Sequence, residues 1–156
     1  IRLNLNYRKN KEKRGHAMKI LLPVDGSTHA ERATRHAIAM FNGCSNPQIF
    51  LINVQEPIDA PEIRSHMPAS EIEAMQETRG GDALAPAREL LTNAGTAFEP
   101  SVLIGPIAET IAQFAVDHGC DQIVMGTRGL GAVGSLLGSI TTRLLHLTEL
   151  PVTLVK

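Results

Sequence analysis

The part of the chain best suited to chemistry is a glycine-rich stretch near its carboxyl end. Five glycines fall within residues 126–138, and the hydroxyl-bearing residues Ser139, Thr141 and Thr142 follow them. Glycine lets a backbone reach positive φ and approach a ligand closely, so that successive N–H groups can point at phosphate oxygens. A helix that starts after such a loop adds unpaired N–H groups and the positive end of its dipole. The pattern predicts a phosphate-binding loop, and a plain flexible connection is the alternative.

Several familiar kinds of site are absent from the sequence. The stretch is not a Walker A loop, because GxxxxGK[ST] does not occur, and no GxGxxG follows the first predicted strand. The six histidines show no metal-ligand spacing such as HExxH. Ser27 stands in Asp-Gly-Ser-Thr rather than in a GxSxG elbow. With no nucleophile, base and orienting acid in view, we expect no catalytic residue and at most slow hydrolysis of a bound nucleotide.

The elements that must position the loop alternate between strand and helix patterns. Short apolar runs predict strands at 19–24, 49–54, 97–104, 122–125 and 152–155. Helical spacing predicts a first helix from Ser27 or Thr28 to Phe41, which Asn42–Gly43 end. It predicts further helices over 71–93, between Pro106 and Gly119, and over 140–147. Residues 55–69, with three prolines, indicate a loop, and Gly80–Gly81 weaken the second helix. The order predicts an α/β fold, an open twisted five-stranded parallel sheet with helices on both faces.

Two loops of this predicted sheet lie where a ligand would bind. In open α/β sheets, ligands occupy the crevice beyond the carboxyl ends of the strands, where the strand order reverses. Residues 25–27 follow the first strand, and the glycine-rich residues 126–138 follow the fourth. The sequence therefore predicts that both loops meet at one site.

Three segments carry a resemblance to a known family: KILLPVDGS from Lys19, GTRGLG from Gly126, and PVTLVK at the end of the chain. With them, residues 18–156 resemble the universal stress protein family. Its ATP-binding members carry G-x2-G-x9-G-[ST], which Gly126, Gly129, Gly138 and Ser139 match, except that eight residues separate Gly129 from Gly138. Eight extended residues span about 26 Å, so the shorter loop can still close. The resemblance implies an adenine nucleotide alpha hydrolase-like, Rossmann-like fold.

The resemblance also implies which residues bind ATP together with Mg²⁺. Asp25 would contact the ribose or help order the metal on the phosphates, and a carboxylate suits both roles; the alternative is a turn and helix-cap residue. Val54 would hold the adenine through its backbone N–H and C=O. Arg128 would reach the phosphates or remain a solvated loop charge. The implied set is Pro23, Val24, Asp25, Val54, Met125, Gly126, Arg128, Gly129, Gly138, Ser139, Ile140 and Thr141.

The implied function is a stress-response protein that binds an adenine nucleotide and acts as a nucleotide-dependent dimeric regulator. Family members dimerise through the last strand, and the apolar edge at Val152–Val155 invites such pairing. The alternatives are a dimeric interaction protein that has lost ATP binding, a slow ATP-hydrolysing enzyme of the same superfold, and a flavodoxin-like redox module. The last would carry its phosphate loop after the first strand.

Charge divides the chain into two parts. Residues 1–17 carry six basic residues and one acidic residue, a net +5, which leaves −6 for residues 18–156. We expect 1–17 to be a disordered basic leader, either an expression leader or an upstream-translated segment; a membrane- or RNA-seeking arm and an organelle-targeting peptide are the alternatives. The acidic body argues against nucleic acid, and no apolar run reaches the ~18 residues of a membrane span. Two distant cysteines without a CxxC pair favour a reduced, cytoplasmic setting.

Overall fold

Five parallel strands form a sheet in the order β3–β2–β1–β4–β5. The computed structural model describes residues 17–41, 47–129 and 137–156. The strands are β1 (Lys19–Pro23), β2 (Gln48–Gln55), β3 (Phe98–Ile104), β4 (Gln122–Gly126) and β5 (Val152–Val155). Each lies within a residue or two of its predicted position. The predicted parallel α/β fold is confirmed.

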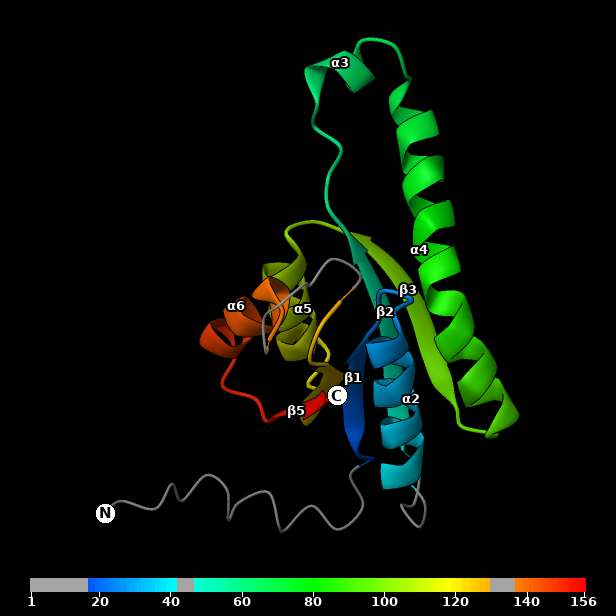
Figure 1. Cartoon of the computed structure of the whole chain (residues 1–156), viewed down its shortest axis with the longest axis vertical. Coiled ribbons are helices and arrows are strands. Elements are labelled where there is room, and N and C mark those ends of the chain that lie inside the picture. Colours follow the sequence, from blue (N-terminus) through cyan, green and yellow to red (C-terminus); the bar gives the residue numbers. More distant parts are fainter. Residues whose placement is uncertain (1–16, 42–46, 130–136) are drawn as a thin grey trace.

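Helices cover both faces of the sheet (Figure 1). On one face lie α2 (Thr28–Met40) and α4 (Ala69–Asn93), and on the other lie α5 (Ile107–Asp117) and α6 (Ser139–Leu147). Successive side chains of a strand point to opposite faces, so Leu22 packs in the α2/α4 layer and Leu21 in the α5/α6 layer. Both are fully buried. This two-sided burial explains why the strand sequences are continuous apolar runs rather than alternating ones.

The turn between β1 and α2 is fixed by local hydrogen bonds. Ser27 is the N-cap of α2, and its hydroxyl accepts a hydrogen bond from the Ala30 N–H at 3.2 Å. Gly26 adopts φ +79°, a conformation that favours glycine, and a Cβ there would lie 3.4 Å from Ala83 Cα of α4. The predicted end of this helix at Asn42–Gly43 lies outside the described residues.

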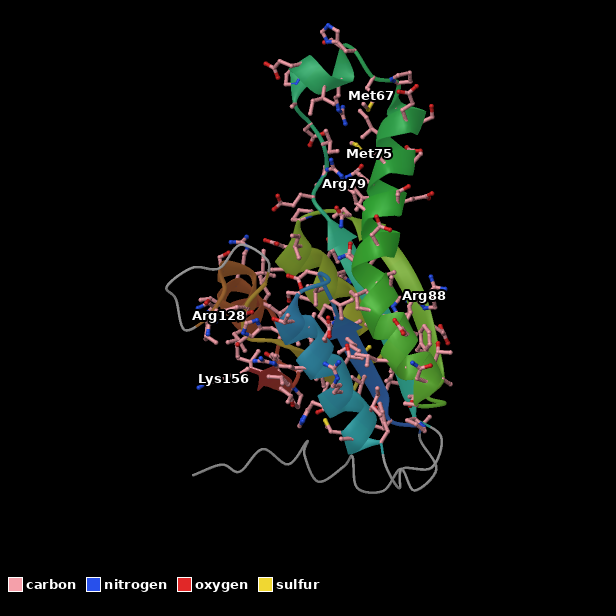
Figure 2. All side chains as sticks on the ribbon, turned by 45° about the vertical axis from the view of Figure 1, so that its right-hand side comes forward. Met67, Met75, Arg79, Arg88, Arg128 and Lys156 are labelled. Carbon is pink, nitrogen blue, oxygen red and sulfur yellow. The ribbon has the colours of Figure 1, made fainter. Side chains whose placement is uncertain are left out.

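The predicted loop over residues 55–69 is interrupted by a short helix. The segment contains the short helix α3 (Pro61–Arg64), which begins at a proline whose missing N–H costs nothing in the first turn. Arg64, at the end of α3, forms an ion pair with Asp59, which precedes the helix, at 2.8 Å. With the first half of α4, this segment forms a projection beyond the sheet, residues 56–79, which includes Met67, Met75 and Arg79 (Figures 1 and 2).

The expected weak point at Gly80–Gly81 is also absent, because α4 runs unbroken through both residues. Gly80 lies so close to β3 that a Cβ would overlap Val102 and would stand 2.7 Å from its Cγ2 atom. A Cβ at Gly81 would meet nothing within 4 Å. The first glycine therefore lets the helix pack on the sheet, and the second has no such function.

Alanine at these two neighbours is expected to change stability in opposite directions. Gly80→Ala overpacks the contact with Val102 and should cost about 1–3 kcal/mol, whereas Gly81→Ala should stabilise by about 0.5–1 kcal/mol through helix propensity. Urea unfolding of both variants measures the difference, and each serves as the control for the other. Equal effects at both positions would contradict the packing observed between α4 and β3.

Among the described helices, none combines the length and apolar character that crossing a bilayer requires.

Candidate functional site

A cavity of about 980 Å³ opens at the carboxyl ends of β1 and β4. The strand order reverses here, because the chain moves from β1 to β2 and β3 on one side and returns to β4 and β5 on the other. Every residue of the predicted set lines this cavity. The structure therefore brings the two predicted loops and the end of β2 together, while the binding role of each residue stays a prediction.

The described glycines of the loop do not adopt positive φ, and two of them lie close to other parts of the chain. Positive φ occurs among the described glycines at Gly26, Gly95 and Gly119, and not at Gly126, Gly129 or Gly138. Gly126 is the last residue of β4, and a Cβ there would lie 2.7 Å from His29 Cβ and 2.9 Å from the His29 carbonyl carbon. A Cβ at Gly129 would overlap Asp25 Oδ2. Close packing on the backbone of α2 therefore requires glycine at Gly126, whereas a Cβ at Gly129 would displace only the end of the Asp25 side chain. Gly131 and Gly134 lie outside the described residues.

Asp25 combines the two roles that the sequence left open. Its Oδ1 atom accepts a hydrogen bond from the Ser27 N–H at 3.0 Å, which holds the turn before α2. Its Oδ2 atom lies beside Gly129, and the residue lines the cavity. Of the described residues that line the cavity, Asp25 is the only acid. A ligand in the cavity would therefore meet this carboxylate next to the glycine-rich loop.

The start of α6 presents unpaired backbone donors to the cavity. Gly138 is the N-cap, no side chain caps the helix, and the first bond within the helix runs from Thr142 N to Gly138 O at 3.0 Å. The N–H groups of Ser139, Ile140 and Thr141 thus find no acceptor in the described part of the chain. The Thr141 hydroxyl is 3.5 Å from the carbonyl oxygens of both Gly126 and Thr127, so its backbone is what a ligand would meet. Such a helix end favours an anion.

Two arginines line the cavity, and they differ in their hydrogen-bond partners. Arg128 follows β4 on the α6 side of the molecule (Figure 2), and its Nε atom is buried without an acceptor among the described residues. Arg143 on α6 donates from Nε to Glu109 Oε1 on α5 at 2.6 Å. That hydrogen bond lowers the pKa of the Glu109 carboxyl below its usual value. Arg128 therefore suits a ligand anion better than Arg143 does.

The end of β2 presents its backbone to the same cavity. The Gly105 N–H donates to Gln55 O at 3.0 Å, so the peptide groups of Gln55 face β3. Successive residues of a strand alternate, and the peptide groups of Val54 therefore face the other side, where β1 has already ended at Pro23. This geometry suits the predicted contact of Val54 with a base.

Sequence reasoning missed Asn53, Arg143 and His146, which also line the cavity. Asn53 is 4% exposed, and its Nδ2 atom donates to the Val24 carbonyl at 2.7 Å. The sequence does carry a signal for Asn53, which is the one polar residue within the apolar run IFLINV. Arg143 and His146 belong to no motif and reach the cavity only because α6 runs along its wall.

Groups that often carry chemistry elsewhere lie apart from this cavity. Burial raises the pKa of the Cys120 thiol to about 11, which disfavours the reactive thiolate. In the part of the chain that the structure describes, no group of three or more His, Cys, Asp or Glu residues stands ready to hold a metal ion.

Comparison with known proteins identifies the family. A family model described as "Universal stress protein family" matches residues 16–156. The chain belongs to the universal stress protein family. This membership confirms the resemblance seen in the sequence, while the boundary between residues 17 and 18 stays a prediction.

One relative of this universal stress protein supports the family by its sequence, and two solved structures share its fold. A Thermus aquaticus protein named "Universal stress protein in QAH/OAS sulfhydrylase 3'region" is 35% identical over 139 residues, covering 88% of this chain and 97% of its own. Universal stress protein UspA from Lactobacillus plantarum shares the fold with a TM-score of 0.75 at 18% identity, over 92% of this chain and 100% of its own. A family member from Arabidopsis thaliana with AMP bound has a TM-score of 0.63 at 20% identity, over 89% and 91%.

Proposed function

We propose that this universal stress protein binds an adenine nucleotide, ATP with Mg²⁺, in the cavity at the carboxyl ends of β1 and β4. The observation that carries the proposal is the start of α6, whose unpaired N–H groups face the same cavity as Asp25 and Val54. The helix end matches the phosphates of one ligand, the Asp25 carboxylate matches its sugar, and the backbone at the end of β2 matches its base. The AMP bound to the Arabidopsis protein of the same fold supports this choice of ligand class.

Each part of the nucleotide then has a partner in this chain. The N–H groups of Ser139, Ile140 and Thr141, with Arg128, hold the phosphates. Asp25 accepts hydrogen bonds from the ribose hydroxyls or supplies one oxygen ligand to Mg²⁺, which would neutralise phosphate charge when bound. Val54 reads the base through its backbone. Because none of these groups serves as a base toward water, the proposal is regulation by binding, in the cytoplasm, rather than rapid turnover.

Calorimetric titration with ATP, AMP and FMN, each with and without Mg²⁺, tests the proposal. We expect heat of binding with the adenine nucleotides, a tighter complex for ATP when Mg²⁺ is present, and none with FMN. Binding of FMN alone would favour the flavodoxin-like alternative. Absence of binding by all three would favour a dimeric interaction protein that has lost ATP binding.

Asp25→Ala is expected to weaken Mg·ATP binding by roughly 1–3 kcal/mol, because it removes charge-assisted hydrogen bonds or a metal ligand. The variant also loses the bond to the Ser27 N–H, so part of any loss in stability belongs to the turn. Asp25→Asn separates the two effects, since its side-chain oxygen can still accept that bond without the charge. We expect Asp25→Asn to melt near the wild type and still to bind Mg·ATP weakly; wild-type affinity in Asp25→Asn would limit Asp25 to the turn.

We also propose a homodimer through β5, which is an edge strand of the sheet. The opposite edge, β3, carries Pro100, which has no N–H to offer a partner. In β5 every residue has an N–H, and Val152 and Leu154 are only partly buried. An unprotected edge of this kind pairs readily with a second copy of itself about a two-fold axis.

A further inference from the structure

The hydrogen-bond ladder between β1 and β2 lacks its last bond, although the two backbones run on far enough to form it. The Val24 N–H donates to Ile52 O at 2.9 Å. In a parallel ladder the next bond runs from the N–H two residues further along the partner strand, here Val54, to the Val24 carbonyl. The structure does not contain that bond. The Val24 carbonyl accepts instead from Nδ2 of the Asn53 side chain at 2.7 Å.

The Asn53 side chain is fixed in this position. It is 4% exposed, and its Oδ1 atom accepts a hydrogen bond from Gln55 Nε2 at 2.5 Å. With its oxygen engaged by Gln55, the amide must present its NH₂ group to Val24. The Asn53 amide therefore occupies the acceptor that the Val54 N–H would otherwise use.

The consequence is a buried backbone donor at Val54 without its ladder partner. Val54 is 7% exposed and lines the cavity, and its peptide groups face the side on which β1 has ended. Buried N–H groups are almost always paired in folded proteins. An N–H kept from its ladder bond at a cavity wall therefore indicates a ligand that accepts a hydrogen bond there.

We infer that Asn53 is a positioning residue for the base: by capping the Val24 carbonyl it keeps the Val54 N–H available to an adenine ring. The inference rests on the proposed nucleotide site, and it explains how that site would recognise the base. Adjacent N–H and C=O groups match the N1 acceptor and the exocyclic amine of adenine. Guanine places a donor and an acceptor at these positions in the opposite order, so the same edge rejects it.

Hydrogen exchange of the ligand-free protein, followed by NMR, tests the Asn53 contact without any nucleotide. In the wild type we expect the Val54 amide to exchange faster than those of Asn53 and Gln55, which bond to β3. Asn53→Leu keeps the side-chain volume but removes the donor, so the ladder should close and slow exchange at Val54. Gln55→Ala is the matched control, because the Val24 carbonyl can only accept and so still selects the NH₂ group of Asn53 when the Gln55 amide is absent. Equal protection of the three amides in the wild type would overturn the inference, even if Asn53→Leu fails to fold.

Binding of ATP and of its 1-deaza analogue, which lacks the N1 acceptor, tests the consequence for the base. The wild type should prefer ATP by about three- to tenfold, the effect of one hydrogen bond. Asn53→Leu should lose this preference by weakening ATP alone, and Gln55→Ala should keep it. Equal weakening of both ligands by Asn53→Leu would reduce Asn53 to a general structural role and overturn the inference. If neither ligand binds the wild type, the proposed function fails, while the exchange pattern still decides whether Asn53 keeps the Val54 amide open.

Discussion

Alanine at Gly126 is expected to lower the stability of the fold, whereas alanine at Gly129 is expected to weaken nucleotide binding at nearly unchanged stability. The Gly126 Cβ would press on the backbone of His29 in the first turn of α2, 2.9 Å from its carbonyl carbon. A helix backbone cannot turn aside as a side chain can, so the overpacking should cost about 1–3 kcal/mol. At Gly129 the new Cβ meets only the end of the Asp25 side chain, which can rotate away.

Rotation of the Asp25 carboxylate removes it from the proposed ribose or metal contact. Losing a charge-assisted hydrogen bond of this kind corresponds to roughly a tenfold or larger fall in affinity. Thermal unfolding and calorimetric titration of Mg·ATP, performed on both variants, give the two readouts. We expect Gly126→Ala to melt about 5 °C lower. A wild-type melting temperature for Gly126→Ala, or wild-type affinity for Gly129→Ala, would contradict the respective assignment.

The two glycines illustrate what a motif can and cannot predict. The spacing of Gly126 and Gly129 predicts that both glycines let the backbone approach a ligand, and both residues line the cavity. The structure separates them, because Gly126 packs against His29, which is distant in sequence, and Gly129 against Asp25. A single sequence shows which residues are small but not which remote atoms approach them. The stability cost at Gly126 was therefore beyond prediction.

The strands and long helices could be predicted because burial imposes a period on the sequence. Strands buried on both faces, as β1 and β2 are, carry nearly continuous apolar runs, and helices carry an apolar stripe. The helix α3 is not predictable from the sequence, because it has only four residues and lies among prolines that also mark loops. Gly80–Gly81 suggested a weak helix because propensity is a local property. The contact of Gly80 with Val102 is tertiary and overrides it.

Asn53 shows the opposite case, because the sequence itself carries a signal for this residue. A buried polar residue needs a hydrogen-bond partner, so a single asparagine inside an apolar strand indicates a partner nearby. The partner is the Val24 carbonyl, beside the predicted Asp25 turn. Only the register of β1 against β2 reveals that this bond replaces a ladder bond of Val54.

The backbone of β5 is expected to join two copies of this chain. The Ile123 N–H donates to Pro151 O and the Thr127 N–H to Val155 O, each at 2.9 Å, so the odd-numbered residues of β5 face β4. The peptide groups of Val152 and Leu154 therefore face outward. In an antiparallel pair centred on Thr153, Val152 of one copy lies opposite Leu154 of the other, and the two exchange hydrogen bonds. On β3 the same alternation turns Pro100 outward, which blocks that edge.

Val152→Pro is expected to convert the dimer to a monomer, because it removes an outward N–H and leaves the bonds to β4 in place. Val152→Ala is the matched control: it also removes the valine side chain but keeps the N–H, so it should remain dimeric. This pair is sharper than aspartate at Val152 and Leu154, whose side chains pack partly on the α5/α6 layer and whose replacement would also strain the fold. Light scattering at micromolar concentration should report about twice 16.8 kDa for the wild type and for Val152→Ala. A monomeric wild type, or a folded Val152→Pro that stays dimeric, would place the interface elsewhere or remove it.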